Sequence, residues 1–117
     1  MLTVAGIFGF LGVALGAFAT HALKGMLGPH ALEVFHTGTQ YQMMHTLAIL
    51  ALASSGTAEK PWAKRACQLW AVGILIFSGS LYALALTDVR ILGAITPIGG
   101  VLFLAGWISV AIGARKS

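Results

Sequence analysis

The sequence predicts an all-α integral membrane protein, a four-helix bundle with both termini in the cytoplasm. Hydrophobic residues make up 58% of the 117 residues and charged residues only 9%, whereas about a quarter are charged in typical soluble domains. The few charged residues are placed so that four uncharged windows remain between them. About 20 helical residues cross the hydrocarbon core of a bilayer, so each window is long enough to span it. The windows are residues 1–23, 34–58, 66–87 and 91–114.

The distribution of charge excludes a nucleic-acid-binding protein. The net charge is +4, but Lys and Arg lie at the ends of the predicted helices and form no basic stripe and no nucleic-acid motif. Cys67 is the only cysteine, so no disulfide forms within the chain. No arrangement of catalytic carboxylates or nucleophiles, phosphate loop or nucleotide fingerprint is recognisable. We therefore expect a protein that is not an enzyme.

The orientation follows from the positive-inside rule, by which cytoplasmic loops carry the excess of Lys and Arg. With four spans, the second loop and the C-terminal tail share the side of the N-terminus. That side carries five cations and the opposite side only two, Lys24 and Arg90, so both termini are predicted to be cytoplasmic. The five are Lys60, Lys64, Arg65, Arg115 and Lys116.

The first helix is expected over about residues 2–23. No Lys or Arg precedes its apolar run, so we expect it to be retained rather than cleaved as a signal peptide. Gly9, Gly12, Gly16 and Thr20 fall within about 80° of one another at 100° per residue. Such a groove of small residues lets a second helix approach closely in lipid. We favour packing against the protein's own helices; the other interpretation is an interface with another subunit.

The second helix, about residues 30–55, is distinguished by polar residues in its N-terminal half. Gly28–Pro29 marks its start, because proline is tolerated in the first helical turn. Its polar residues fall on two nearly opposite faces, and polar residues within a span are costly unless they find polar surroundings. We therefore expect this helix to be central, in contact with its own bundle and with another subunit. One face carries Glu33, His36 and Gln40, and the other carries Tyr41 and His45.

Six residues of the first two helices form a candidate polar site within the membrane. Three interpretations are open: a metal or haem site, since neutral histidine is a common ligand; a proton relay; and inter-helix hydrogen bonding. No His and carboxylate cluster has a recognised metal-ligand spacing, so we favour hydrogen bonding and expect no metal and no cofactor. The six are His21, His36, Gln40, Tyr41, Gln42 and His45.

The third and fourth helices are expected over about residues 64–87 and 91–114. In the fourth, Pro97 removes a backbone donor and is followed by Gly99 and Gly100, so we expect a kink. The carbonyls freed there either line a site for a cation or are satisfied by neighbouring side chains, and we favour the second interpretation. Small residues also recur every seven positions along this helix: Gly99, Gly106 and Gly113.

Five ordered motifs lie along the chain: Gly16–Leu23, which reads GAFATHAL, Tyr41–Ala48, Phe77–Tyr82, Thr96–Gly100 and Gly106–Trp107. Together they resemble the YgdD-like family of small four-helix membrane proteins. The first motif is similar to the family's Gly-Ala-Phe-Gly-Ala-His-Ala-Leu, with Ala19 and Thr20 in place of Gly and Ala. The similarity covers essentially the whole chain.

The resemblance implies a bacterial inner-membrane protein of four helices, in a family of unknown function that also has eukaryotic relatives. It implies no activity. It does single out polar and kinked positions as part of the family pattern, and these are positions that the residue-level reasoning also selected. They are His21, Tyr41, Gln42, His45, Pro97, Gly99 and Gly100.

Residues 1–117 are thus predicted to form one membrane domain without catalytic activity, which crosses the cell inner (plasma) membrane several times. We expect it to act as a homo-oligomer or as an accessory subunit of a membrane complex. Its partners are then the lipid bilayer and a second membrane-protein chain, with no nucleic acid. The alternative is a channel or transporter for protons or a small solute that uses His21, His36, Gln40 and His45.

Overall fold

The computed structural model describes residues 1–116, and among them all regular structure is helical, without a strand. This confirms the all-α prediction. Three consecutive elements, α3, the π-helical η2 and α4, follow one another without a break and form one long rod, called the central rod below. The elements are α1 (Leu2–His21), the 3-10 turn η1 (Leu23–Gly25), α2 (Pro29–Ala53), α3 (Pro61–Gly73), η2 (Ile74–Ser78), α4 (Gly79–Thr87) and α5 (Leu92–Lys116).

Local sequence accounts for where these helices begin and end. α2 and α3 begin at Pro29 and Pro61, where the ring fixes a helical φ and the missing N–H would have been unpaired in any case. α4 ends at Thr87, and Asp88 after it has a φ of 56°. A short polar side chain is among the few that tolerate this left-handed region. The chain turns there and enters α5.

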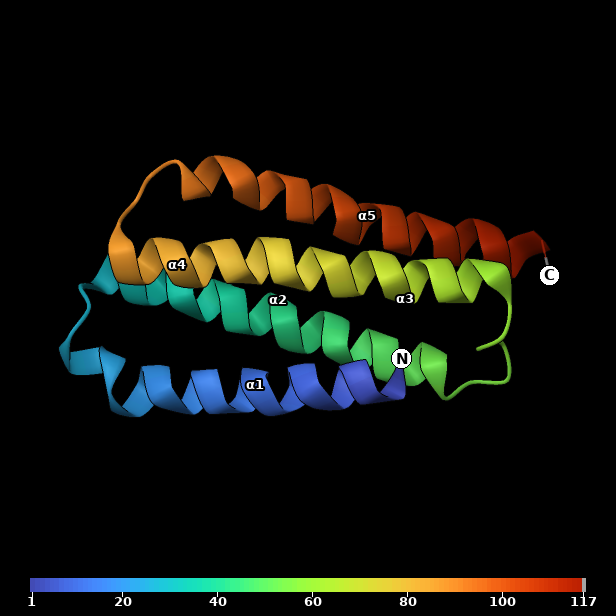
Figure 1. Ribbon diagram of the computed structural model, residues 1–117, viewed down its shortest axis with the longest axis horizontal. Coiled ribbons are helices and arrows are strands. Elements are labelled where there is room, and N and C mark those ends of the chain that lie inside the picture. Colours follow the sequence, from blue (N-terminus) through green and yellow to red (C-terminus); the bar gives the residue numbers. More distant parts are fainter. Residues whose placement is uncertain (117) are drawn as a thin grey trace.

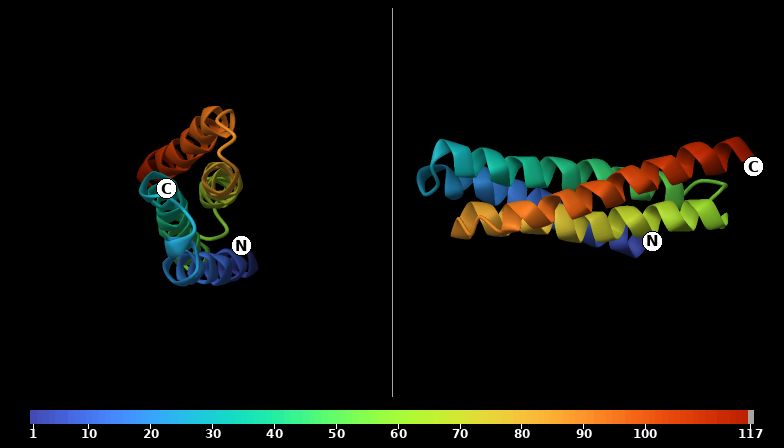
Figure 2. Two further views of the ribbon diagram at one scale, coloured as in Figure 1. Left: turned by 90° about the vertical axis from the view of Figure 1, so that its left-hand side faces the viewer. Right: turned by 90° about the horizontal axis from the view of Figure 1, so that it is seen from above.

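Four helical rods run side by side along the long axis of the molecule (Figure 1). α1 packs against α2, α2 packs against the central rod, and α5 packs against the central rod in turn. The end-on view in Figure 2 places α1 and α5 at opposite ends of this row. The Cα atoms extend over 49 × 26 × 16 Å. Each rod therefore packs mainly on its neighbour in the chain, and α1 and α5 keep broad exposed faces.

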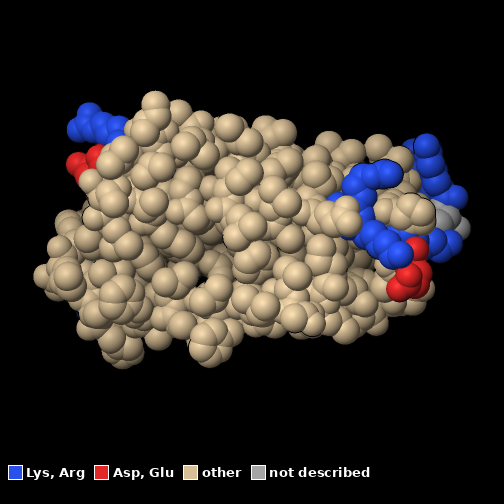
Figure 3. Space-filling model, in the orientation of Figure 1, with Lys and Arg blue, Asp and Glu red and all other residues tan. Residues whose placement is uncertain are grey.

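Three helical stretches are long and apolar enough to cross a membrane, namely Leu2–His21, Pro61–Thr87 and Leu92–Lys116. α2 has 25 residues and is excluded from this set by its polar residues rather than by its length. Charged side chains gather at the two ends of the rods, and the belt between them carries none on the face shown in Figure 3. The chain has the helices of a multi-pass membrane protein, and one of its four rods is unusually polar.

The larger of two core clusters lies where α2, the central rod and α5 meet. Trp70 is its largest residue, is 2% exposed, and packs with Ile49, Ile74 and Phe103. A smaller cluster near the opposite end joins α1, η1, α2 and α4. Its buried members are Ala19, Leu23, Phe35 and Ala85.

α5 approaches the central rod closely because glycine faces that rod at every second turn. Three glycines spaced seven residues apart each lie against one aromatic side chain, and a Cβ at any of them would overlap that side chain. In lipid, such close packing takes over much of the role that hydrophobic burial has in water. The seven-residue repeat in the sequence is therefore an internal packing seam. The pairs are Gly99 with Phe77, Gly106 with Trp70 and Gly113 with Trp62.

The π-helical turn η2 lies where the two backbones approach most closely. A Cβ built on Gly99 would lie 2.5 Å from the backbone nitrogen of Phe77 and 2.8 Å from its Cα. One residue before η2, a Cβ on Gly73 would lie 2.7 Å from the ring of Phe103 and 3.3 Å from the carbonyl oxygen of Gly99. Backbone cannot move aside as a flexible side chain does, so this contact depends on glycine.

Gly99 and the adjacent Gly100 offer a matched test of this seam. We expect Gly99→Ala to lower the free energy of unfolding by about 2 kcal/mol, since overpacking a well-packed site costs about 1–3 kcal/mol. Gly100→Ala meets only the Phe77 ring at 3.9 Å and should be neutral or stabilising, because alanine is the better helix former. Denaturation of both variants in the same micelles, followed by circular dichroism, measures the difference. Equal effects of the two substitutions would contradict the proposed contact.

Candidate functional site

Gln42 joins three helices through its side-chain amide. It lies in α2 and is 3% exposed. Its Nε2 donates to the carbonyl oxygen of Phe8 in α1 at 2.8 Å, and its Oε1 accepts from the hydroxyl of Tyr82 in α4 at 2.5 Å. Both ends of the amide are therefore paired, and each pairs with a different neighbouring rod.

The central rod packs against Gly38, which lies one helical turn before Gln42. The Ser78 hydroxyl donates to the carbonyl oxygen of Gly38 at 2.7 Å, and a Cβ on Gly38 would lie 2.7 Å from Cε1 of Tyr82. Ser78 is the last residue of η2 and is fully buried. The missing side chain of Gly38 thus lets Tyr82 reach Gln42.

His45 is 2% exposed and uses both of its ring nitrogens. Nδ1 lies 2.9 Å from the carbonyl oxygen of Tyr41, and Nε2 lies 3.1 Å from the indole Nε1 of Trp107 in α5. A carbonyl only accepts and an indole N–H only donates, so the two bonds assign a neutral imidazole with its proton on Nδ1. The ring also stacks on Phe103 with centroids 3.7 Å apart. His45 therefore holds α2 against α5 and has no free nitrogen in this arrangement.

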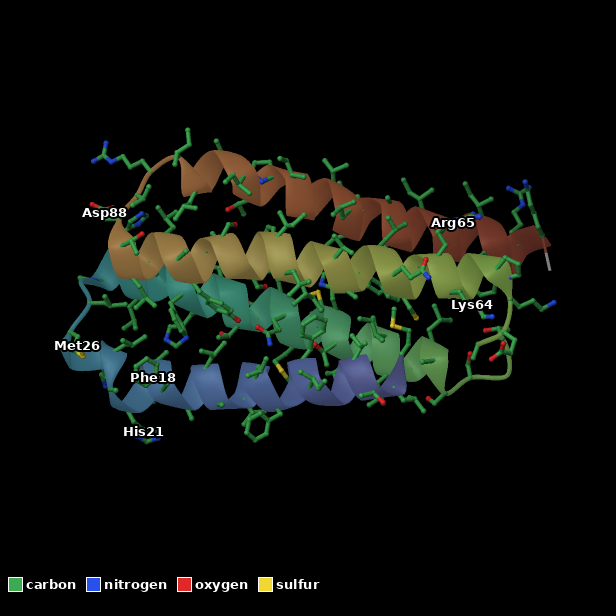
Figure 4. The ribbon with its side chains drawn as sticks, viewed as in Figure 1. Phe18, His21, Met26, Lys64, Arg65 and Asp88 are labelled. Carbon is green, nitrogen blue, oxygen red and sulfur yellow. The ribbon has the colours of Figure 1, made fainter. Side chains whose placement is uncertain are left out.

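Of the other predicted polar residues, all but Tyr41 lie on outer faces, away from these buried bonds. His36 and Gln40 are exposed on the outer face of α2, as is Glu33, and none of the three side chains has a hydrogen bond or ion pair with any other part of residues 1–116. His21 is exposed at the end of α1 and points away from the bundle in Figure 4. Tyr41 is 36% exposed and packs its ring against the central rod.

The structure thus divides the six predicted residues instead of bringing them together. Gln42 and His45 are buried and bonded, Tyr41 lies at the edge of the core, and three residues face outward. Within residues 1–116, no three His, Cys, Asp or Glu side chains lie close enough to hold one metal ion. For Gln42 and His45 the geometry is that of inter-helix hydrogen bonding, which in membranes is worth about 0.6–2 kcal/mol for each bond.

The predicted glycine groove of α1 contacts the rest of the chain over only part of its length. Gly9 faces α2, where a Cβ would lie 3.6 Å from Cγ2 of Thr46, and Gly12 lies directly against the Met43 side chain. Gly16 has no neighbour within 4 Å of such a Cβ. Two of the three predicted packing glycines therefore serve contacts within the chain.

α5 runs as one helix through Pro97, whose ring leaves the carbonyl of Gly93 without its usual N–H donor. Beside it, the Thr96 hydroxyl lies 2.6 Å from the Ser80 hydroxyl of α4 and 3.2 Å from the carbonyl oxygen of Leu92. The polar contact next to the proline is thus made by neighbouring hydroxyl groups.

Two members of the buried network were not identified from the sequence as partners. Tyr82 and Trp107 each supply the donor to a buried acceptor on α2. Both belong to segments that carry the family resemblance, Phe77–Tyr82 and Gly106–Trp107. The family resemblance could therefore have pointed to Tyr82 and Trp107, but their pairing with Gln42 and His45 depends on how the rods are placed.

These features define a class of protein: a multi-pass helical membrane protein whose buried polar groups join its helices. Comparison with known sequences agrees. A family model described as a protein of unknown function (DUF423) matches residues 15–100. The chain belongs to this family, and no catalytic activity is part of the matched descriptions.

Relatives in three bacteria are similar over nearly the whole chain. They are the UPF0382 membrane protein of Haemophilus influenzae, 51% identical over 99% of this chain and 94% of its own; the UPF0382 inner membrane protein YgdD of Escherichia coli K12, 45% identical over 99% and 89%; and the UPF0382 membrane protein YwdK of Bacillus subtilis, 43% identical over 91% and 88%. They confirm the resemblance to the YgdD-like family and the location in the inner membrane. No solved structure matches the chain.

Tyr82 and Tyr41 offer a matched test of the bond to Gln42. Tyr82→Phe removes the donor and leaves the buried Oε1 of Gln42 unpaired, so we expect the free energy of unfolding in micelles to fall by about 1 kcal/mol. Tyr41→Phe removes a hydroxyl that has no hydrogen bond within residues 1–116 and should change it by less than about 0.3 kcal/mol. If both variants unfold like the wild type, the Tyr82–Gln42 bond contributes nothing to stability.

Proposed function

We propose that this chain is a non-catalytic, four-span membrane protein that assembles with a second copy of itself through the outer face of α2. One observation carries the proposal. Glu33, His36 and Gln40 lie outward on a rod that is otherwise enclosed by apolar helices, and their side chains are unpaired within residues 1–116. Polar groups in a bilayer are costly without a partner. A second protein surface supplies that partner.

Two features support α2 as the fourth span. Its 25 residues extend about 37 Å at 1.5 Å per residue, more than the roughly 30 Å hydrocarbon core. It lies between α1 and the central rod, both of which are apolar enough to cross the membrane. Four spans put the N- and C-termini on one side, and the excess of Lys and Arg at that side favours the cytoplasm.

The outer face of α2 is complementary to itself. Glu33 accepts hydrogen bonds, His36 carries a ring donor, and the amide of Gln40 both donates and accepts. In a symmetric dimer the same patch meets its own copy, so carboxylate can face imidazole and amide can face amide. Met44 and Leu47, which are 46% and 57% exposed on the same face, would continue this contact toward the middle of the bilayer.

The buried network supports assembly more strongly than a proton or solute pathway. A relay needs side chains that exchange protons along a chain of neighbours, and His45 has both nitrogens committed to Tyr41 and Trp107. His36 and His21 lie on outer faces of different helices. The residues named for the pathway are therefore not aligned within one chain.

Gln40 and Gln68 provide a matched test of assembly. Gln40→Leu should weaken the dimer about 8- to 30-fold, because two symmetry-related hydrogen bonds at about 0.6–1 kcal/mol each are lost. Gln68→Leu makes the same change at an exposed position of α3 and should leave association unchanged. Energy transfer between donor- and acceptor-labelled copies in liposomes, followed as lipid is added, measures both constants.

Two outcomes would overturn this proposal. A wild-type chain that shows no energy transfer at any protein density does not form the dimer. A dimer that Gln40→Leu and His36→Leu leave intact does not use this face of α2.

A further inference from the structure

A groove of about 410 Å³ lies between the start of α3 and the end of α5, away from the outer face of α2. Arg65 and Lys116 line it, one from each helix, together with Trp62 and the apolar side chains of Ile108 and Ile112. In Figure 4, Arg65 lies between the ribbons of α3 and α5. The groove therefore combines cations with an apolar wall at the Lys- and Arg-rich end of the rods.

Within residues 1–116, no carboxylate neutralises the two cations of the groove. Among residues 1–116 the only side-chain ion pair joins Lys64 to Glu59 at 3.1 Å, and Lys64 lines a different hollow, beside α1 and α2. Arg65 and Lys116 have no carboxylate partner in that part of the chain. An occupant that carries a negative charge would be complementary to them.

The apolar wall of the groove continues toward the middle of the bilayer. Ile108 and Ile112 are 57% and 52% exposed, and Leu104 and Val101 before them are 64% and 62% exposed. These four residues of α5 are spaced three and four apart, so they share one face of the helix. A ligand with a charged head and a long hydrocarbon chain matches this order of surfaces, whereas a free anion matches only the cationic end.

Trp62 adds a polar group to the wall. Its indole Nε1 is buried and is the one buried side-chain nitrogen or oxygen in residues 1–116 that lacks a hydrogen-bond partner. Buried polar groups in native proteins nearly always have a partner. The ester and phosphate oxygens of a phospholipid are hydrogen-bond acceptors of the kind that this N–H lacks.

We propose that this groove binds one anionic glycerophospholipid, with its phosphate between Arg65 and Lys116 and the first part of an acyl chain along Ile108 and Ile112. Basic pockets between membrane helices are a known way of holding such headgroups, with about 1 kcal/mol from each nearby cation. The site is built from α3 and α5, so it does not depend on assembly through α2.

The test uses native mass spectrometry of the full chain in detergent with added phosphatidylglycerol or phosphatidylcholine. The wild type should retain one phosphatidylglycerol at least about tenfold more tightly than phosphatidylcholine. The double variant R65Q/K116Q should lose about 10- to 30-fold in affinity for phosphatidylglycerol. The control K60Q/R115Q removes two cations from the same end but outside the groove, so it should bind like the wild type.

Each contrary result has a definite meaning. Equal losses in R65Q/K116Q and K60Q/R115Q would show a diffuse surface attraction and overturn the site. Ile112→Trp keeps both cations and fills the groove, so unchanged binding by a folded I112W protein would also overturn it. Glycerol 3-phosphate has the head without the chains; if it displaces the lipid at similar concentration, the groove is a phosphate site rather than a lipid site.

Discussion

The hydrogen bonds of Gln42 are the interaction on which the arrangement of the helices most depends. α1 is apolar over its whole circumference, so hydrophobic burial alone selects no particular face of it in lipid. The donation from Gln42 to the carbonyl oxygen of Phe8, beside the glycines at positions 9 and 12, gives α1 one rotation and one depth. The other end of the same amide accepts from Tyr82 and places the central rod. One buried side chain thereby relates three rods.

α5 is also positioned by close packing and a few hydrogen bonds, but through other residues. Its glycines admit Phe77, Trp70 and Trp62, and the Trp70 indole donates to the carbonyl oxygen of Phe103 at 3.3 Å. The bond from Trp107 to His45 then ties α5 to α2 across the central rod. Close backbone contact supplies the packing of α5, and a few polar bonds fix its register against the other helices. Both are expected in a membrane, where lipid is as apolar as the protein surface and hydrophobic burial does not hold helices together.

Sequence reasoning reached the helical class and the membrane location because these follow from where charged residues stand. It also separated Glu33, His36 and Gln40 from His45, since angular position along α2 needs only a helical period. It did not find the partners of Gln42 and His45, because Phe8, Tyr82 and Trp107 are distant in sequence and meet only through packing. The π-helical turn η2 was not foreseen either; it lies against Gly99 of α5, a residue that is distant in sequence.

Two surfaces of the molecule, the outer face of α2 and the groove beside α5, carry polar side chains of different chemistry. Within residues 1–116, the buried side chains of Gln42 and His45 are paired, whereas a polar stripe on α2 and two cations beside α5 lie at the surface without partners. These surfaces belong to different helices, and the first offers both donors and acceptors whereas the second offers only positive charge. A second protein chain fits the first and an anionic lipid fits the second. The two proposed sites therefore do not compete for the same partner.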